Sequence, residues 1–132
     1  MRGEAVVKAL LEAYPGVTAI VSTRIQPAPL PETLALPAIA TRHITTIDLP
    51  TIDAQSYGLV RSRIEVTAVT KTYPVQKQLL EQVRLALQYR RGTIAGYEVV
   101  SVVRDNVGPD LRDDDKMIFS QSVDFVLTLK EV

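Results

Sequence analysis

The residues that could support catalysis or metal binding are few, and the first to consider is a single histidine. His43 is the only histidine, and the chain has no cysteine. One imidazole without a thiolate cannot build a histidine-rich or cysteine-based metal site. A Ser–His–Asp triad would also need a nucleophile motif such as G-x-S-x-G, which the sequence lacks. We therefore interpret His43 as an ordinary residue of a β-strand.

A run of aspartates is the second candidate. Asp113, Asp114 and Asp115, with Asp110 nearby, could bind a hard cation such as Ca²⁺ through carboxylate oxygens. The spacing does not match an EF-hand loop, and adjacent carboxylates repel one another and usually stay in water. We interpret the cluster as a solvated loop and expect no metal. Its alternative role is a charged contact to a partner subunit.

Basic side chains could form a nucleic-acid surface, but their pattern argues against one. Glu65 and Glu81 interrupt the basic positions, and no aromatic residues interleave with them to stack on bases. We therefore expect a salt-bridged outer surface without specific nucleic-acid binding. The basic positions are Arg61, Arg63 and Lys71 in one segment and Arg84, Arg90 and Arg91 in the next.

The glycines form no phosphate-binding motif.

The whole-chain numbers fit one domain, residues 1–132. A chain of this length can bury a sizeable hydrophobic core. The 15 Lys and Arg residues balance the 15 Asp and Glu residues, so the chain has no net charge that would attract nucleic acid or an anionic membrane. Apolar runs fall short of the roughly 20 residues that span a bilayer. Glu4, Lys8 and Glu12 interrupt the first apolar stripe, which argues against a signal peptide. We expect a cytosolic protein with no membrane contact, no cofactor and no enzymatic activity.

The periodicity changes once in the middle of the chain, from that of a strand to that of a helix. Apolar or small residues alternate with charged ones from Val60 to Ala68, which predicts a half-buried strand. After Pro74, apolar residues recur at three- and four-residue steps as far as Leu87, which predicts a helix. Pro74 suits the first helical turn, and Gly92 suits the position just past the end.

Shorter signals predict the other elements. The expected fold class is α+β: a single antiparallel or mixed sheet of about four strands, with two main helices packed on one face. Residues 97–103 are nearly all apolar, which predicts a strand covered on both faces. The further expectations are a helix at 4–13, one helical turn at 17–21, an extended piece at 24–26, a proline-rich loop at 27–37, strands at 38–47 and 117–130, a polar turn at 48–56 and an acidic loop at 105–116.

Five segments, taken in order, resemble the phage tail-completion protein family. The first two are ALLEAYPGVTAIVSTRIQP and LPAIATRHI, within residues 9–27 and 36–44. The middle is similar through TAVTKTYPVQKQLLEQVRLAL, within residues 61–87, and through RRGTIAGYEV (residues 90–99), most of which lies in the matching piece 92–103. The last, residues 113–129, is an acidic loop followed by a strand that carries SVDFVLTL. The resemblance covers nearly the whole chain and implies a single tail-completion-like domain.

The resemblance implies a structural protein of a phage or prophage that completes the tail and helps join it to the head. The implied partners are other virion proteins, namely the tail tube protein and the head connector or completion proteins. Related proteins assemble as rings, and some are monomers in solution before assembly. The implied location is the cytoplasm of the bacterial host during assembly, and then the head–tail junction of the virion. The family carries no catalytic residues.

Loop tips are the expected contact elements, because they reach beyond the core. They belong to the loops at residues 27–37, 48–57 and 105–116. A small α+β module that binds a ligand or peptide without catalysis, in a pocket between sheet and helices, is the alternative function, and an enzyme such as a hydrolase is a third. The expected contact residues are Asp48, Thr51, Asp53, Tyr57, Asp110, Arg112, Asp113, Asp114 and Asp115.

Overall fold

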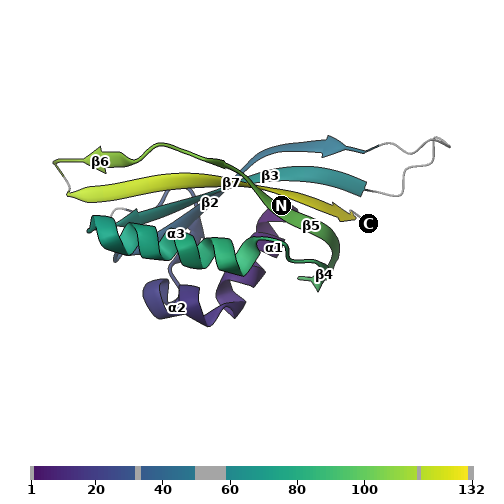
Figure 1. Ribbon diagram of the computed structural model, residues 1–132, viewed down its shortest axis with the longest axis horizontal. Coiled ribbons are helices and arrows are strands. Elements are labelled where there is room, and N and C mark those ends of the chain that lie inside the picture. Colours follow the sequence, from purple (N-terminus) through teal and green to yellow (C-terminus); the bar gives the residue numbers. More distant parts are fainter. Residues whose placement is uncertain (1, 32–33, 50–58, 116, 131–132) are drawn as a thin grey trace.

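A computed structural model shows three helices and seven strands in the part of the chain that it describes, residues 2–31, 34–49, 59–115 and 117–130 (Figure 1). The helices carry stripes of apolar residues, and the long strands alternate apolar with polar residues. In chain order, the elements are α1 (Arg2–Ala13), α2 (Pro15–Val21), β1 (Ile25–Pro27), β2 (Ala38–Asp48), β3 (Leu59–Thr70), α3 (Tyr73–Leu87), β4 (Gly92–Ile94), β5 (Tyr97–Val107), β6 (Leu111–Asp113) and β7 (Ile118–Lys130).

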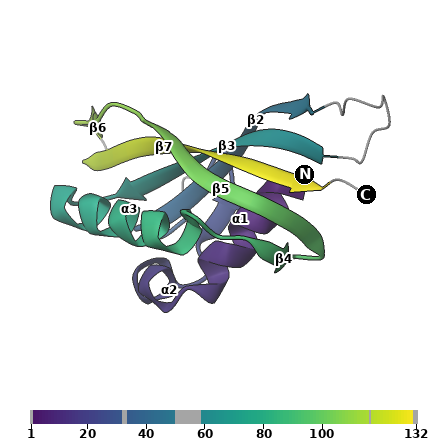
Figure 2. The ribbon, with the colours of Figure 1, turned by 45° about the vertical axis from the view of Figure 1, so that its right-hand side comes forward.

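The strands form one mixed sheet with β7 near its middle. The strand order is β1-β2-β3-β7-β5-β4, and β6 pairs with the first residues of β7. β1 runs parallel to β2, whereas the other pairs are antiparallel. α1 and α3 lie against one face of the sheet, and α2 packs on both of these helices (Figure 2). We call the opposite face of the sheet its outer face.

The predicted count of about four strands and two helices is wrong, although the fold remains α+β. The sheet has seven strands, and the described residues form three helices. β1, β4 and β6 have three residues each, which is too short for a period of two to be recognised. α2, expected as a single turn, has seven residues and begins at Pro15, where proline suits the first turn.

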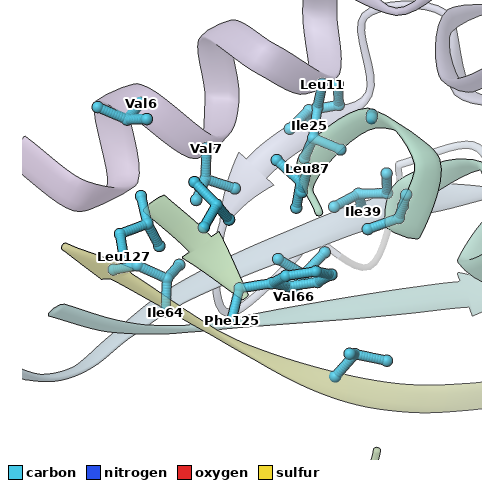
Figure 3. Close-up of a cluster of buried hydrophobic side chains, with 14 of the residues drawn as sticks. Val6, Val7, Leu11, Ile25, Ile39, Ile64, Val66, Leu87, Phe125 and Leu127 are labelled. Carbon is cyan, nitrogen blue, oxygen red and sulfur yellow. The ribbon is translucent and has the colours of Figure 1, made fainter. Parts of the chain in front are cut away.

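The alternation in β3 places the core between the sheet and the helices. Val60, Ile64, Val66 and Ala68 are all buried, as the pattern predicts. Figure 3 shows side chains from α1 and the strands meeting in this layer. Gly3 permits the close approach of α1, because a Cβ there would lie 3.1 Å from both Ile64 Cδ1 and Ser62 Cβ.

β5 is not covered on both faces, contrary to the prediction for residues 97–103. Val99 and Val102 are buried, but Val100 and Val103 are 52% and 42% exposed. Register shifts against β7 occur between Val99 and Ser101 and again between Arg104 and Asn106. Such bulges break the simple alternation of faces, so the continuous apolar run does not indicate burial on both sides.

Three predicted boundaries also differ from the structure. Residues 105–116 are not a simple loop, because β5 continues to Val107 and β6 pairs with β7. Asp48 belongs to β2 rather than to a turn. α3 ends at Leu87, so Gly92 does not directly follow the helix as expected but begins β4. Tyr89 takes the left-handed conformation (φ 65°) near the helix end.

Candidate assembly surfaces

Around the middle of β3, the outer face of the sheet is polar, and several of its charged side chains form ion pairs. Alternation with the buried residues directs Arg63, Glu65 and Thr67 of β3 to this face. The Glu65 carboxylate forms an ion pair with Arg42 of β2 at 3.1 Å, and the Thr67 and Ser122 hydroxyls are 2.8 Å apart. These contacts join β3 to the strand on each side of it, as cross-strand pairs do.

Arg63 is the centre of a three-residue ion cluster on that face. Its guanidinium lies 2.5 Å from Asp105 on β5 and 3.2 Å from Asp124 on β7. The hydrogen bond to Asp105, with a smaller one to Asp124, raises the pKa of Arg63. The prediction of a salt-bridged outer surface is therefore confirmed for Arg63, and Arg42 has the same kind of partner.

Two basic residues, Arg84 in α3 and Arg90 just after it, also have local partners. Arg84 donates to the Glu81 carboxylate and to the Gln88 side chain. The hydrogen bond from Arg84 lowers the pKa of Glu81 below its ordinary value. Arg90 donates to the backbone carbonyls of Ala86 and Leu85, which are acceptors that the end of a helix leaves open.

The β2–β3 arm is the first projecting element, and we define it as residues 42–48 of β2 with residues 59–63 of β3. All seven of these β2 residues are exposed, and the strand ends extend beyond the helices (Figure 1). Ile47 is 59% exposed, and Ile44 lies at the register shift between His43 and Thr45. His43 Nε2 lies 2.6 Å from Thr46 Oγ1, which fits the prediction of an ordinary strand residue.

The free edge of β2 adds to the arm's capacity for contacts. β1 pairs only with residues 39–41 of β2. Beyond Thr41, no other strand among the described residues pairs with that edge. An unpaired edge presents backbone N–H and C=O groups that another chain can bind.

The β6 hairpin is the second projecting element, and we define it as residues 108–115 with residues 118–121 of β7. α3 anchors it. Lys77 of α3 donates to Asp110 at 2.6 Å and to the Gln121 side-chain oxygen at 2.7 Å. The Gln121 amide in turn donates to the Gly108 carbonyl at 2.8 Å. These three contacts join the helix, the segment before β6 and β7.

Three of the aspartates around β6 have hydrogen-bond or ion-pair partners within the protein. Arg112 lies 2.7 Å from Asp114, and the backbone N–H of Asp115 donates to Asp113. Among the residues that the structure describes, no three His, Cys, Asp or Glu side chains are placed to hold a metal ion. In the same part of the chain, no helix is long and apolar enough to cross a membrane.

The structure divides the predicted contact residues between two ends of the molecule. Asp48 lies at the end of the β2–β3 arm, whereas Asp110 and Arg112, with the three aspartates that follow, lie around β6 (Figures 1 and 2). Thr51, Asp53 and Tyr57 fall outside the described residues. The predicted residues that the structure describes therefore form two separate candidate surfaces.

Sequence reasoning missed a third surface, which we call the outer groove. Residues 28–31 and 34–36 of the proline-rich segment line an open groove of about 820 Å³ together with outer-face residues of β2 and β3. The groove is lined by Ala28, Pro29, Leu30, Pro31, Leu34, Ala35, Leu36, Ala40, Thr67, Val69, Lys71 and Ile118.

Contacts at both ends of this segment hold it in place. The Ala28 N–H donates to the Thr41 carbonyl, and Arg24 Nε donates to the Pro37 carbonyl, each at 2.9 Å. The leucines between the prolines were the sequence signal that could have identified the groove.

A smaller cavity of about 230 Å³, with charged residues in its lining, lies between α3 and the sheet.

Comparison with known proteins provides a structural neighbour but no family. No family model matches the sequence, and a search of curated proteins finds no match. The fold is similar to a chain in the structure described as "Virion of native gene transfer agent (GTA) particle". The two share 15% identity with a TM-score of 0.77, over 97% of this chain and 94% of the other. At this identity, the likeness shows a shared fold.

Proposed function

We propose that this chain is a structural component of a phage-like virion particle, without enzymatic activity. The single observation that carries the proposal is the structural likeness to a chain of a gene transfer agent virion, which extends over nearly the full length of both chains. A match over whole chains differs from one limited to a common motif, because it includes the peripheral strands and helices as well as the core.

The finer proposal is that the protein completes the tail and helps join it to the head. The ordered resemblance to tail-completion proteins supports this role. The geometry suits it, because a joining subunit must contact neighbours on more than one side. The β2–β3 arm and the β6 hairpin lie at opposite ends of the sheet (Figure 1), and one edge of β2 is open. Self-association into a ring and contacts to tail tube and connector proteins are the expected interactions.

Deletion of the coding sequence tests this role in cells that produce the particles. The expected result is that electron microscopy shows filled heads and separate tails in place of joined particles. Expression of the protein from a second locus restores joined particles. Normal joined particles after deletion would refute the joining role, and a loss of heads themselves would place the protein at an earlier step of assembly.

The outer groove supports a second candidate function, a module that binds a small ligand or peptide without catalysis. Its volume of about 820 Å³ falls within the usual range for ligand pockets. A ligand present at 100 times its Kd would stabilise the protein by about 2.7 kcal/mol. Thermal unfolding against a library of small molecules and peptides, with Val69→Lys as a blocked-groove control, measures this. Stabilisation that Val69→Lys abolishes would favour this function.

A further inference from the structure

We propose that the cavity between α3 and the sheet binds the carboxylate of an acidic side chain of a protein partner, and that Arg104 receives this carboxylate. We call this space, of about 230 Å³, the α3 cavity. The inference rests on the proposed function, because it names the chemistry by which the chain would hold a neighbouring protein of the particle.

The helix wall of the α3 cavity carries two cations that already have carboxylate partners. Lys77, Glu81 and Arg84 follow one another at steps of four and three residues, so they lie along one face of α3. Arg84 donates from Nε and from a terminal nitrogen to the two oxygens of the Glu81 carboxylate. Lys77 donates to the Asp110 carboxylate. Neither cation is therefore free to receive a further carboxylate without losing its present partner.

The sheet wall supplies a third cation, Arg104 of β5. Arg104 pairs in register with Phe125 of β7, whose side chain is fully buried. Cross-strand partners lie on the same face of a sheet, so Arg104 lies on the helix side, where it lines the cavity. Asp105, the next residue, pairs with Arg63 on the outer face. The carboxylate adjacent in sequence is therefore directed away from Arg104.

Arg104 is not neutralised by a contact of its own. Among the described residues, no ion pair or side-chain hydrogen bond includes its guanidinium. The hydrogen bond from Arg84 is the main cause of the lowered pKa of Glu81, and the charge of Arg104 adds to it. Arg104 therefore lies near the Glu81–Arg84 pair without replacing either member.

The balance of charge defines the ligand. In the part of the chain that the structure describes, three cations line the cavity, while Glu81 lines it and Asp110 contacts it through Lys77. One positive charge is left in excess, which a singly charged carboxylate neutralises and a doubly charged phosphate exceeds. A guanidinium also matches a carboxylate geometrically, because its planar fork donates two parallel hydrogen bonds.

The size and the apolar part of the cavity favour a side chain as the source of the carboxylate. A volume of about 230 Å³ is smaller than the roughly 300–1,000 Å³ of small-molecule pockets, so it holds one functional group. Leu80, Val107 and Val123 supply apolar lining for the carbon atoms of an entering side chain. Val107 is 47% exposed, which makes the cavity accessible from solvent.

The absence of native cysteine allows a carboxylate to be attached at one chosen position. Val107→Cys is equilibrated by thiol–disulfide exchange with equal concentrations of mercaptopropionate and its neutral amide, and mass spectrometry of the intact protein measures the ratio of the two mixed disulfides. Attachment raises the effective concentration of the carboxylate, so that a weak ion pair becomes measurable. The matched control, Val100→Cys, lies on the same strand and is 52% exposed. It corrects for the different reactivity of the two thiols.

The expected ratio of carboxylate to amide product is at least about threefold higher at position 107 than at position 100, as suits a partly exposed ion pair. Adding Arg104→Gln to Val107→Cys lowers the ratio to the control value, whereas Arg104→Lys keeps part of the excess because the charge remains. Equal ratios at the two positions, or an excess that survives Arg104→Gln, would overturn the proposal. A larger excess for mercaptoethylphosphonate than for mercaptopropionate would assign the cavity to phosphate and overturn the carboxylate.

The protein source of the carboxylate is tested in cells that produce the particles. Arg104→Glu places a negative charge where the partner's carboxylate would bind, so it should lower the yield of joined particles. Arg91→Glu, an equal change of charge at an exposed position, is the control and should leave the yield unchanged. Equal yields for the two variants would refute a protein partner at this cavity.

These results are separate from the test of the virion role. Particles that contain the chain, together with equal disulfide ratios at positions 107 and 100, would refute the binding site and leave the virion role intact. A carboxylate excess that depends on Arg104, in a chain that is absent from particles, would establish the site and refute the virion role.

Discussion

Gln76 is a buried residue whose chemistry does not fit its surroundings. It lies in α3, its side chain is fully buried, and neither Nε2 nor Oε1 has a hydrogen-bond partner among the described residues. A buried polar group without a partner costs about 1–3 kcal/mol. The residue therefore lowers stability at a position where an apolar side chain of similar size would fit.

We predict that Gln76→Met raises the free energy of unfolding by about 1–2 kcal/mol, because it removes the unpaired amide while nearly preserving volume. Urea denaturation followed by circular dichroism measures the change. Gln78→Met, at an exposed position of the same helix, is the matched control and should change stability little. A lower stability for Gln76→Met than for the unmodified protein would contradict this account of the site.

The Glu81–Arg84 pair gives a pH-dependent prediction. Because the pKa of Glu81 is lowered on folding, its stabilising contribution is present above the unfolded pKa and disappears as pH falls through the folded value. The pair is largely exposed, so solvent screens it and the effect on stability is small. NMR titration of the Glu81 carboxyl should give a lower pKa in the unmodified protein than in Arg84→Met. Equal midpoints in the two proteins would show that the ion pair does not persist in solution.

At the scale of elements, the attachment of the β6 hairpin depends on Lys77. We predict that Lys77→Met destabilises the protein by about 1 kcal/mol and speeds hydrogen exchange at the Gly108 amide, which donates to the Ser122 carbonyl. Lys8→Met, which removes an exposed pair with Glu12 at 3.7 Å, should change neither quantity appreciably. Unchanged exchange at Gly108 in Lys77→Met would mean that β6 is held by its pairing with β7 alone.

How far each element could be predicted depends on its length and on the number of faces that it buries. β3 and β7 each bury one face over a long strand, of 12 and 13 residues, so their alternation was visible in the sequence. β6 has three residues, all exposed, and its acidic sequence resembles a loop. β5 is apolar on both sides, but Val100 and Val103 face solvent, and periodicity alone does not distinguish a buried apolar face from one that is exposed.

The candidate surfaces were predictable only where they are local in sequence. The acidic hairpin and the end of β2 follow from runs of polar residues at the ends of strands, and Asp48 and Asp110 were both expected to be contact residues. The outer groove brings Leu30, Val69 and Ile118 together from three distant segments. Such a surface depends on how the proline-rich segment crosses the sheet, which no local pattern specifies.

At the scale of the whole molecule, self-association should depend on the arm and not on general surface hydrophobicity. We predict that Ile47→Asp abolishes concentration-dependent association in sedimentation velocity while changing the free energy of unfolding by less than about 0.5 kcal/mol, because the side chain is exposed. Leu111→Asp, a similarly exposed position on β6, is the control and should leave association unchanged. Loss of association in both variants would point to nonspecific contacts.

The central claim is that this fold serves as a part of a virion particle, and its location in purified particles tests that claim most directly. Particles are isolated by density gradient from cells that carry the coding sequence, and then examined by mass spectrometry and by immunogold electron microscopy against this chain. The account predicts that its peptides are present at low copy number and that gold labels gather where head and tail meet. Particles that lack the chain, with all of it recovered in the soluble cell fraction, would contradict the account.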